Sequence, residues 1–140
     1  SLYTDGASRG NPGESGIGFI IKKDGKTFIK GCYYTGKCTN NFAEYLAFLT
    51  GLKEALKLFE LENIKCYSDS LLLVNQISGK FKIKNKKIIK LCSIISSLCD
   101  IQKINVNYIP RDKNKEADAL ANKGINEKIK LPEHINSYLS

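Results

Sequence analysis

The sequence predicts a mixed α/β domain in which helices flank a five-stranded sheet. Near the N-terminus, three strand-like segments follow one another and are separated only by turn residues, a pattern typical of antiparallel strands. Farther along, two shorter strand-like segments alternate with segments of helical periodicity. Strands joined through helices pair in parallel, so we expect three antiparallel strands followed by parallel ones. The first and fourth strands are expected to form the central parallel pair.

Length and composition suit one globular domain that binds a polyanion. The chain has 140 residues, 42% of them hydrophobic, and its formal net charge is +8, which favours nucleic acid or an anionic membrane surface as a partner. No run approaches the roughly 18 apolar residues of a membrane span, and no signal peptide precedes the first strand, so we expect no membrane association. Residues 1–125 are expected to form the domain, and residues 126–140, which show no clear period, a tail. The five cysteines form no C-x-x-C pair, which predicts reduced thiols in the cytoplasm.

The first strand is predicted to end at Asp5, above a tight polar loop. Three glycines and a proline follow this carboxylate within eight residues. Small side chains there leave room for a metal ion or a phosphate backbone, although an Asp–Gly pair alone is more often an ordinary turn. The second strand is expected at residues 16–21, a turn at Asp24–Gly25, and the third strand at residues 27–34.

A long amphipathic helix is predicted next, with Thr39 or Asn40 as its cap. Glu44 lies in its second turn, among residues that mostly face inward. Considered alone, Glu44 is better explained as a surface residue at the edge of the apolar face. The apolar residues recur at spacings of three and four, and they are Phe42, Tyr45, Leu46, Leu49, Leu52, Leu56 and Phe59.

A second acidic residue is expected at the end of a parallel strand. Residues 63–67 form the predicted strand, and Asp69 follows it, before a helix over residues 71–77. Ligand sites of parallel sheets gather at such carboxyl ends, whereas an Asp that caps the following helix is the alternative role. The two roles are compatible.

A basic stretch and a further helix come next. Six lysines lie between residues 80 and 90, and the apolar stripe of a helix follows over residues 88–99. Such a run is either a solvated face or a set of phosphate contacts.

The last predicted strand covers residues 104–109. A helix is expected from residue 114 and should stop at Gly124. Asp118 lies near the start of this helix, where the helix dipole favours a negative carboxylate.

Four short motifs together resemble type 1 ribonuclease H. They read D-G-A-S-R-G-N-P-G, T-N-N-F-A-E, Y-S-D-S and N-K-E-A-D-A-L-A-N, and they occur in the family's order over about residues 3–124. The resemblance implies the ribonuclease H-like fold, with Asp5, Glu44, Asp69 and Asp118 as metal-binding catalytic carboxylates. Four converging negative charges repel one another unless cations compensate them. Two Mg²⁺ ions, with Mn²⁺ as a possible substitute, would supply that charge.

The same resemblance implies an activity and a partner. Members of the family hydrolyse the RNA strand of RNA–DNA hybrids by a two-metal-ion mechanism and leave 3′-hydroxyl and 5′-phosphate ends. We therefore expect an endonuclease that acts on such hybrids as a monomer, with no small-molecule cofactor.

Seven further residues match substrate contacts of the family. Asn11, Asn40 and Asn41 match positions at the minor groove of the hybrid, where the 2′-hydroxyl distinguishes RNA from DNA. Another group matches a pocket that grips a phosphate of the DNA strand; its members are Lys37, Thr39 and Asn85. Helix capping, turn formation and solvation are the alternative roles of these six residues. The loop over residues 110–113 lacks the histidine that many members carry, and Arg111 is expected to contact the product phosphate instead.

Three alternatives share the fold. The first is a domain that binds hybrids without cleaving them, although such domains usually lose one of the carboxylates. The second is another nuclease, such as a transposase or junction resolvase, whose carboxylate spacing would differ. The third is a ribonuclease H domain that belongs to a reverse transcriptase or another larger polypeptide.

Overall fold

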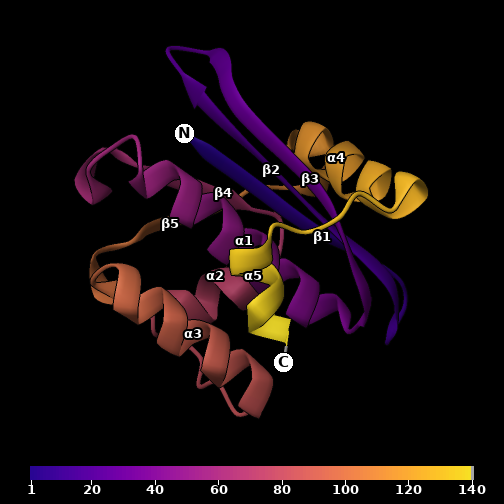
Figure 1. The fold of residues 1–140 in the computed structure, drawn as a ribbon. Coiled ribbons are helices and arrows are strands. Elements are labelled where there is room, and N and C mark those ends of the chain that lie inside the picture. The colour runs from indigo at the N-terminus through magenta and orange to yellow at the C-terminus, as the bar shows by residue number, and fades with distance from the viewer. Residues whose placement is uncertain (140) are drawn as a thin grey trace.

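A five-stranded sheet forms the centre of the structure, a computed structural model that describes residues 1–139. Its strands are β1 (Leu2–Gly10), β2 (Gly13–Lys23), β3 (Lys26–Cys38), β4 (Lys65–Ser68) and β5 (Asn105–Tyr108). Their spatial order is β3-β2-β1-β4-β5 (Figure 1). The β1–β2 and β2–β3 pairs are antiparallel, and the β1–β4 and β4–β5 pairs are parallel. The predicted mixed sheet, with the first and fourth strands as its central parallel pair, is confirmed.

Helices cover both faces of the sheet. They are α1 (Asn40–Leu56), α2 (Leu71–Ile77), α3 (Lys86–Leu98), α4 (Lys115–Glu127) and α5 (Glu133–Asn136), with short 3₁₀ turns at Leu61–Asn63, Ile101–Lys103, Arg111–Lys113 and Ser137–Leu139. In Figure 1, α4 lies on one side of the sheet and the other helices gather on the opposite side. The main core fills the space between α1 and the sheet, where Leu2, Phe19 and Leu49 are fully or almost fully buried. No helix among residues 1–139 is long and apolar enough to cross a membrane.

The first strand was predicted to end at Asp5, and this is wrong, because β1 continues to Gly10. Residues 5–10 stay paired with β2, from Asp5 opposite Gly18 to Gly10 opposite Gly13. Only two residues connect the strands. The small residues after Asp5 therefore belong to a paired strand and not to a loop. Their size does not prevent this, because pairing uses backbone groups and does not depend on side-chain size.

Two predicted helix ends are also wrong. The first helix stops at Leu56 rather than near Phe59, where the chain turns with Phe59 N–H donating to the Ala55 carbonyl. The last long helix passes through Gly124 and ends at Glu127. A Cβ on Gly124 would lie 2.4 Å from the Tyr33 carbonyl oxygen. Glycine is thus needed here for close packing of α4 on β3, and it does not end the helix.

The chain after α4 packs onto the domain. We call residues 129–139 the C-terminal segment; it belongs to the stretch predicted as a tail, whose residue 140 lies outside the described residues. Tyr34 N–H donates to the Ile129 carbonyl over 2.7 Å and ties this segment to β3. Leu131 and Ile135 are buried in the main core. An apolar residue every fourth position gives too short a pattern to recognise in the sequence, although it suffices for one helical turn.

Candidate active site

Asp5 and Asp69 lie side by side at the centre of the sheet. The parallel register places Thr4 of β1 opposite Ser68 of β4, so that the next residue along each strand direction, Asp5 or Asp69, lies beside the other. Glu44 joins them from α1, where its Oε1 accepts a hydrogen bond from Gly6 N–H over 2.7 Å. One carboxylate oxygen of each of the three residues lies within 4.8 Å of the others. The predicted convergence of these three carboxylates is present in the structure.

Gly6 determines how closely α1 approaches the sheet. A Cβ at this position would lie 2.3 Å from the Ala43 carbonyl carbon and 2.4 Å from the Glu44 nitrogen. Such distances are far inside van der Waals contact, so any other residue would push the helix away from β1. The glycine after Asp5 therefore brings Glu44 within reach of the strand.

Asp118 and Arg111 complete the same depression, which has a volume of about 450 Å³. Asp118 lies in the first turn of α4 and interacts directly with the Asp5 carboxyl. The Arg111 guanidinium is near enough to Glu44 to favour its charged form. All four predicted carboxylates and the predicted arginine are thus at one place, four of them on different elements and Asp69 in the link between β4 and α2.

Burial and neighbouring negative charge both disfavour the charged forms of Asp5 and Glu44. Burial, followed by the negative charges of Glu44 and Asp69, raises the pKa of Asp5 to about 10. Burial also raises the pKa of Glu44 to about 7, against the opposing effect of the Gly6 N–H. Oxygen ligands in a compact acidic group are the donors that Mg²⁺ and Mn²⁺ prefer, so this group fits such ions. Divalent charge would offset both the cost of burial and the repulsion that raise these pKa values.

Asn114 supports this group and was not predicted to do so. Its side chain is 2% exposed, and its Nδ2 donates to the Thr4 carbonyl over 2.9 Å and to Asp69 Oδ2 over 3.1 Å. It therefore fixes the Asp69 carboxylate relative to the backbone of β1. The Asn114 Oδ1 is buried and has no hydrogen-bond partner among the described residues. In the sequence Asn114 is indistinguishable from a helix cap, but its side chain makes no capping hydrogen bond.

Two of the three predicted asparagines, Asn11 and Asn40, lie together beside the carboxylates. Asn40 N–H donates to Asn11 Oδ1 over 3.0 Å, which joins the turn between β1 and β2 to the start of α1. Both residues line the active-site depression. Asn41 follows in α1, and its Oδ1 is buried without a hydrogen-bond partner among residues 1–139.

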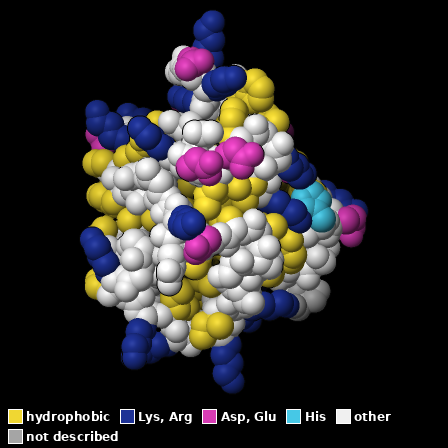
Figure 2. Space-filling model, turned by 90° about the vertical axis from the view of Figure 1, so that its left-hand side faces the viewer, with side chains coloured by type: hydrophobic (Ala, Val, Ile, Leu, Met, Phe, Trp, Pro, Cys, Tyr) yellow, Lys and Arg dark blue, Asp and Glu magenta, His cyan; other side chains and the backbone are white. Residues whose placement is uncertain are grey.

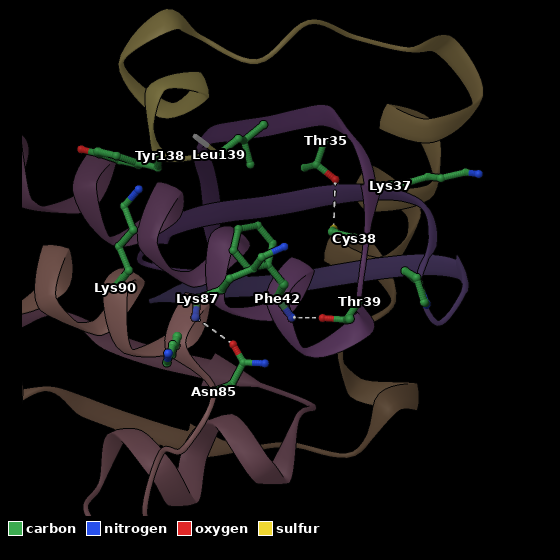
Figure 3. A pocket seen from close by; sticks show the side chains of 12 residues that line it. Thr35, Lys37, Cys38, Thr39, Phe42, Asn85, Lys87, Lys90, Tyr138 and Leu139 are labelled. Atoms are coloured by element: carbon green, nitrogen blue, oxygen red, sulfur yellow. Dashed lines mark hydrogen bonds between the residues drawn. The ribbon is translucent and has the colours of Figure 1, made fainter.

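Lys37, Thr39 and Asn85 line a second and larger cavity, of about 650 Å³, which we call the basic cavity (Figure 3). Thr39 Oγ1 accepts from Phe42 N–H and caps α1, and Asn85 Oδ1 accepts from Lys87 N–H and caps α3. Thr39 and Asn85 therefore do cap helices, which was the alternative role considered for them. Cys38, which lies between Lys37 and Thr39 in the sequence, also lines the basic cavity, as do lysines of α3.

Comparison with known proteins identifies the family. A family model described as "Reverse transcriptase-like" matches residues 3–124. The chain is 38% identical, over 86% of its length, to a bifunctional protein of Mycobacterium tuberculosis, of which it spans only 34%. It is 34% identical to the ribonuclease H of Bartonella quintana, covering 90% of this chain and 88% of that protein.

A solved structure agrees with these relatives. The crystal structure of LC11-RNase H1 in complex with an RNA/DNA hybrid matches with a TM-score of 0.83 and 34% sequence identity. The match covers 90% of this chain and 96% of that one. Fold, sequence and carboxylate arrangement point the same way, and the chain belongs to the ribonuclease H family.

Proposed function

We propose that the chain is an endonuclease that hydrolyses the RNA strand of RNA–DNA hybrids and leaves 3′-hydroxyl and 5′-phosphate ends. The observation that carries this proposal is the convergence, within 4.8 Å, of Asp5 on β1, Glu44 on α1 and Asp69 just after β4. A cluster of this kind is costly unless it holds cations, as the raised pKa values of Asp5 and Glu44 indicate. The hybrid-bound LC11-RNase H1 supports the substrate class.

In this mechanism the protein supplies charged side chains at fixed positions around the cations. We propose that Asp5, Glu44, Asp69 and Asp118 hold two divalent cations. When bound, such cations activate water and stabilise negative charge on the leaving 3′ oxygen. Asn114 keeps the Asp69 carboxylate aligned through its 3.1 Å hydrogen bond. Arg111 places a positive charge at the rim of the depression, where a product phosphate would leave.

We propose that the RNA strand and the DNA strand of the hybrid are recognised on opposite sides of the start of α1. The asparagines next to Glu44 are proposed to read the 2′-hydroxyls of the RNA strand in the minor groove. The basic cavity is proposed to hold a phosphate of the DNA strand. Lysines suit this role, because phosphate contacts position a duplex without reading its sequence. Figure 2 shows one face of the molecule, where Lys and Arg side chains project at many points with Asp and Glu side chains between them, in keeping with the net charge of +8.

Cleavage of a labelled chimeric strand tests the proposal. The strand contains a short run of ribonucleotides within DNA, is annealed to complementary DNA, and is incubated with Mg²⁺ or Mn²⁺. We expect cuts only inside the ribonucleotide run, with 3′-hydroxyl and 5′-phosphate ends, and none in a duplex made only of DNA. Equal cutting of ribose and deoxyribose linkages would show that the proposal is wrong.

The setting of the reaction is a further part of the proposal. We propose that the domain acts in the cytoplasm as a monomer. The five cysteines, all free in the structure, support a reducing compartment.

A further inference from the structure

The basic cavity is larger than a phosphate contact requires. Its volume of about 650 Å³ lies within the range of roughly 300–1,000 Å³ that is typical of sites for whole ligands. Thr39 and Cys38 lie at one end, and Tyr138 and Lys90 at the other (Figure 3). A phosphate held at the Thr39 end would leave most of the cavity unused.

The far end of the cavity is built by the C-terminal segment. Leu131 and Ile135 anchor this segment in the core, and Tyr138 and Leu139 follow at the cavity wall. Lys53 Nζ donates to Tyr138 Oη over 2.9 Å and lies 5.3 Å from the centre of its ring. These contacts fix the orientation of the Tyr138 ring before any ligand arrives, so little ordering cost remains for binding.

The lining combines positive charge with apolar and aromatic surface. Lys86, Lys87 and Lys90 contribute ammonium groups from α3, and no Asp or Glu is among the described residues that line the cavity. Phe42, which is 9% exposed, contributes apolar surface to the lining, as Tyr138 and Leu139 do at the far wall. Cationic side chains beside aromatic rings are the usual means of holding a single-stranded nucleotide, whose phosphate and base meet the two kinds of surface.

The position of the cavity indicates which nucleotide it holds. Asn11 and Asn40 line the active-site depression, whereas their neighbours Pro12 and Thr39 line the basic cavity. The two spaces are therefore separated by one turn and one helix start. If the RNA strand lies over the carboxylates, the partner DNA strand passes the mouth of the cavity, as the proposed function requires.

We propose that the Tyr138 end of the basic cavity binds an unpaired nucleotide with which the DNA strand extends beyond the hybrid. Its base would lie against the Tyr138 ring, and its phosphate would lie among the lysines of α3. The inference rests on the proposed function, because that function places the DNA strand at this cavity. It adds a preference for junctions between hybrid and single-stranded DNA.

Binding to matched hybrids tests the inference. The Asp69→Asn protein, which should bind without cleaving, is titrated in Mg²⁺ with a fluorescent hybrid that is either blunt or extended by a few unpaired nucleotides. The extension is placed in turn at each end of the DNA strand, and then of the RNA strand. We expect a DNA extension at one end to tighten binding at least about fivefold, the effect of stacking one base on one ring. RNA extensions should give no gain.

Variants of Tyr138 in the Asp69→Asn background separate stacking from folding. Tyr138→Ala should abolish the gain from the extension and leave affinity for the blunt hybrid unchanged, whereas Tyr138→Phe should retain the gain. Tyr138→Leu preserves apolar volume for packing and should behave as Tyr138→Ala does, which covers the case in which the alanine variant unfolds. Thermal unfolding verifies that the variants compared are folded.

Three results would overturn the inference. The first is that no DNA extension tightens binding, and the second is that Tyr138→Leu shows the same gain in affinity as the protein with Tyr138. The third is that free deoxyadenosine monophosphate, at the concentration of the hybrid, fully displaces the extension. Cleavage of a blunt hybrid by the unmodified chain is measured in parallel. Cleavage without an extension effect rejects only the inference, whereas no cleavage of any hybrid rejects the proposed function itself.

Discussion

The active site and the basic cavity lie on either side of the start of α1, yet they are built in opposite ways. The active site is acidic, and its Asp5 and Glu44 are only 5% and 7% exposed on packed elements. The basic cavity takes most of its charge from exposed lysines on α3 and its far wall from the C-terminal segment. A cluster of like charges needs a rigid frame to hold it together, whereas dispersed lysines can adapt to a polyanion. We therefore expect substitutions at the active site to be severe and substitutions at the cavity to be graded.

The largest effect is expected at the active site. Asp69→Asn should lower the rate of hybrid cleavage by roughly three orders of magnitude or more, because it removes charge from the proposed cation site. Hybrid binding should survive, since the lysines and asparagines are unchanged. Asp112→Asn, at an exposed position of the same chain, is the matched control. Near wild-type cleavage by Asp69→Asn in Mg²⁺ would contradict the two-metal assignment.

The next prediction concerns pH in the absence of divalent ions. The pKa of Asp5 rises from its ordinary 3.8 to about 10 on folding, so the folded state keeps a proton that the unfolded state has lost. The contribution of Asp5 to stability is complete below about pH 4 and is lost as pH rises toward 10. Thermal unfolding in a chelator should therefore show stability falling across this window.

Asp5→Asn provides the comparison for that measurement. The variant lacks the titrating group, so its stability should change less with pH than that of the unmodified chain. Added Mg²⁺ should restore stability at high pH in the unmodified chain alone, because cation binding releases the proton. Parallel pH curves for the two proteins would contradict the assignment of the effect to Asp5.

Asn114→Ala should have an intermediate effect. Loss of the hydrogen bond to Asp69 is expected to lower Mg²⁺ affinity and turnover by about 10- to 100-fold, as for other residues that orient metal ligands. The KM for the hybrid should stay the same, because the buried Asn114 offers almost no surface for a substrate to contact. Calorimetric titration with Mg²⁺ measures the affinity. Asn107→Ala removes a hydrogen bond to the Cys66 carbonyl on β4 and serves as the control; similar losses in both variants would indicate a merely structural role.

The smallest effect is expected from the lysines. The triple variant Lys84→Ala, Lys86→Ala and Lys87→Ala should weaken hybrid binding and flatten the slope of log affinity against log salt by about one unit for each lost phosphate contact. A control with the same loss of charge replaces exposed Lys26, Lys30 and Lys123 on β3 and α4. An unchanged slope in the first variant would show that its lysines only increase solubility.

The sequence predicted those features that follow from local pattern and chain order. Asp5 and Asp69 could be placed side by side because crossover connections make β1 and β4 parallel neighbours. Glu44 and Asp118 were predicted as site residues only from the family motifs, because their positions in the helical pattern do not indicate a site. The helix over residues 71–77 was also predicted with its observed bounds.

The remaining features depend on contacts between distant residues. Gly124 has the appearance of a helix stop until the backbone of Tyr33 is known to lie against it. Asn114 resembles a cap, and only its contacts with Thr4 and Asp69 reveal its position at the site. The C-terminal segment is too short to show a period, and it is ordered by the core into which Leu131 and Ile135 insert. In each case tertiary packing overrides the local pattern.

The start of α1 has a consequence for the shape of the substrate. Thr39 lines the basic cavity and Glu44 the active site, and the helix holds them five positions apart, a rise of about 7.5 Å. A helix of 17 residues with a buried face cannot stretch to accommodate a wider ligand. A duplex can therefore engage both sites only if its groove width brings one backbone to each of them. The domain would select its duplex by a dimension set by a single rigid element, without reading any base.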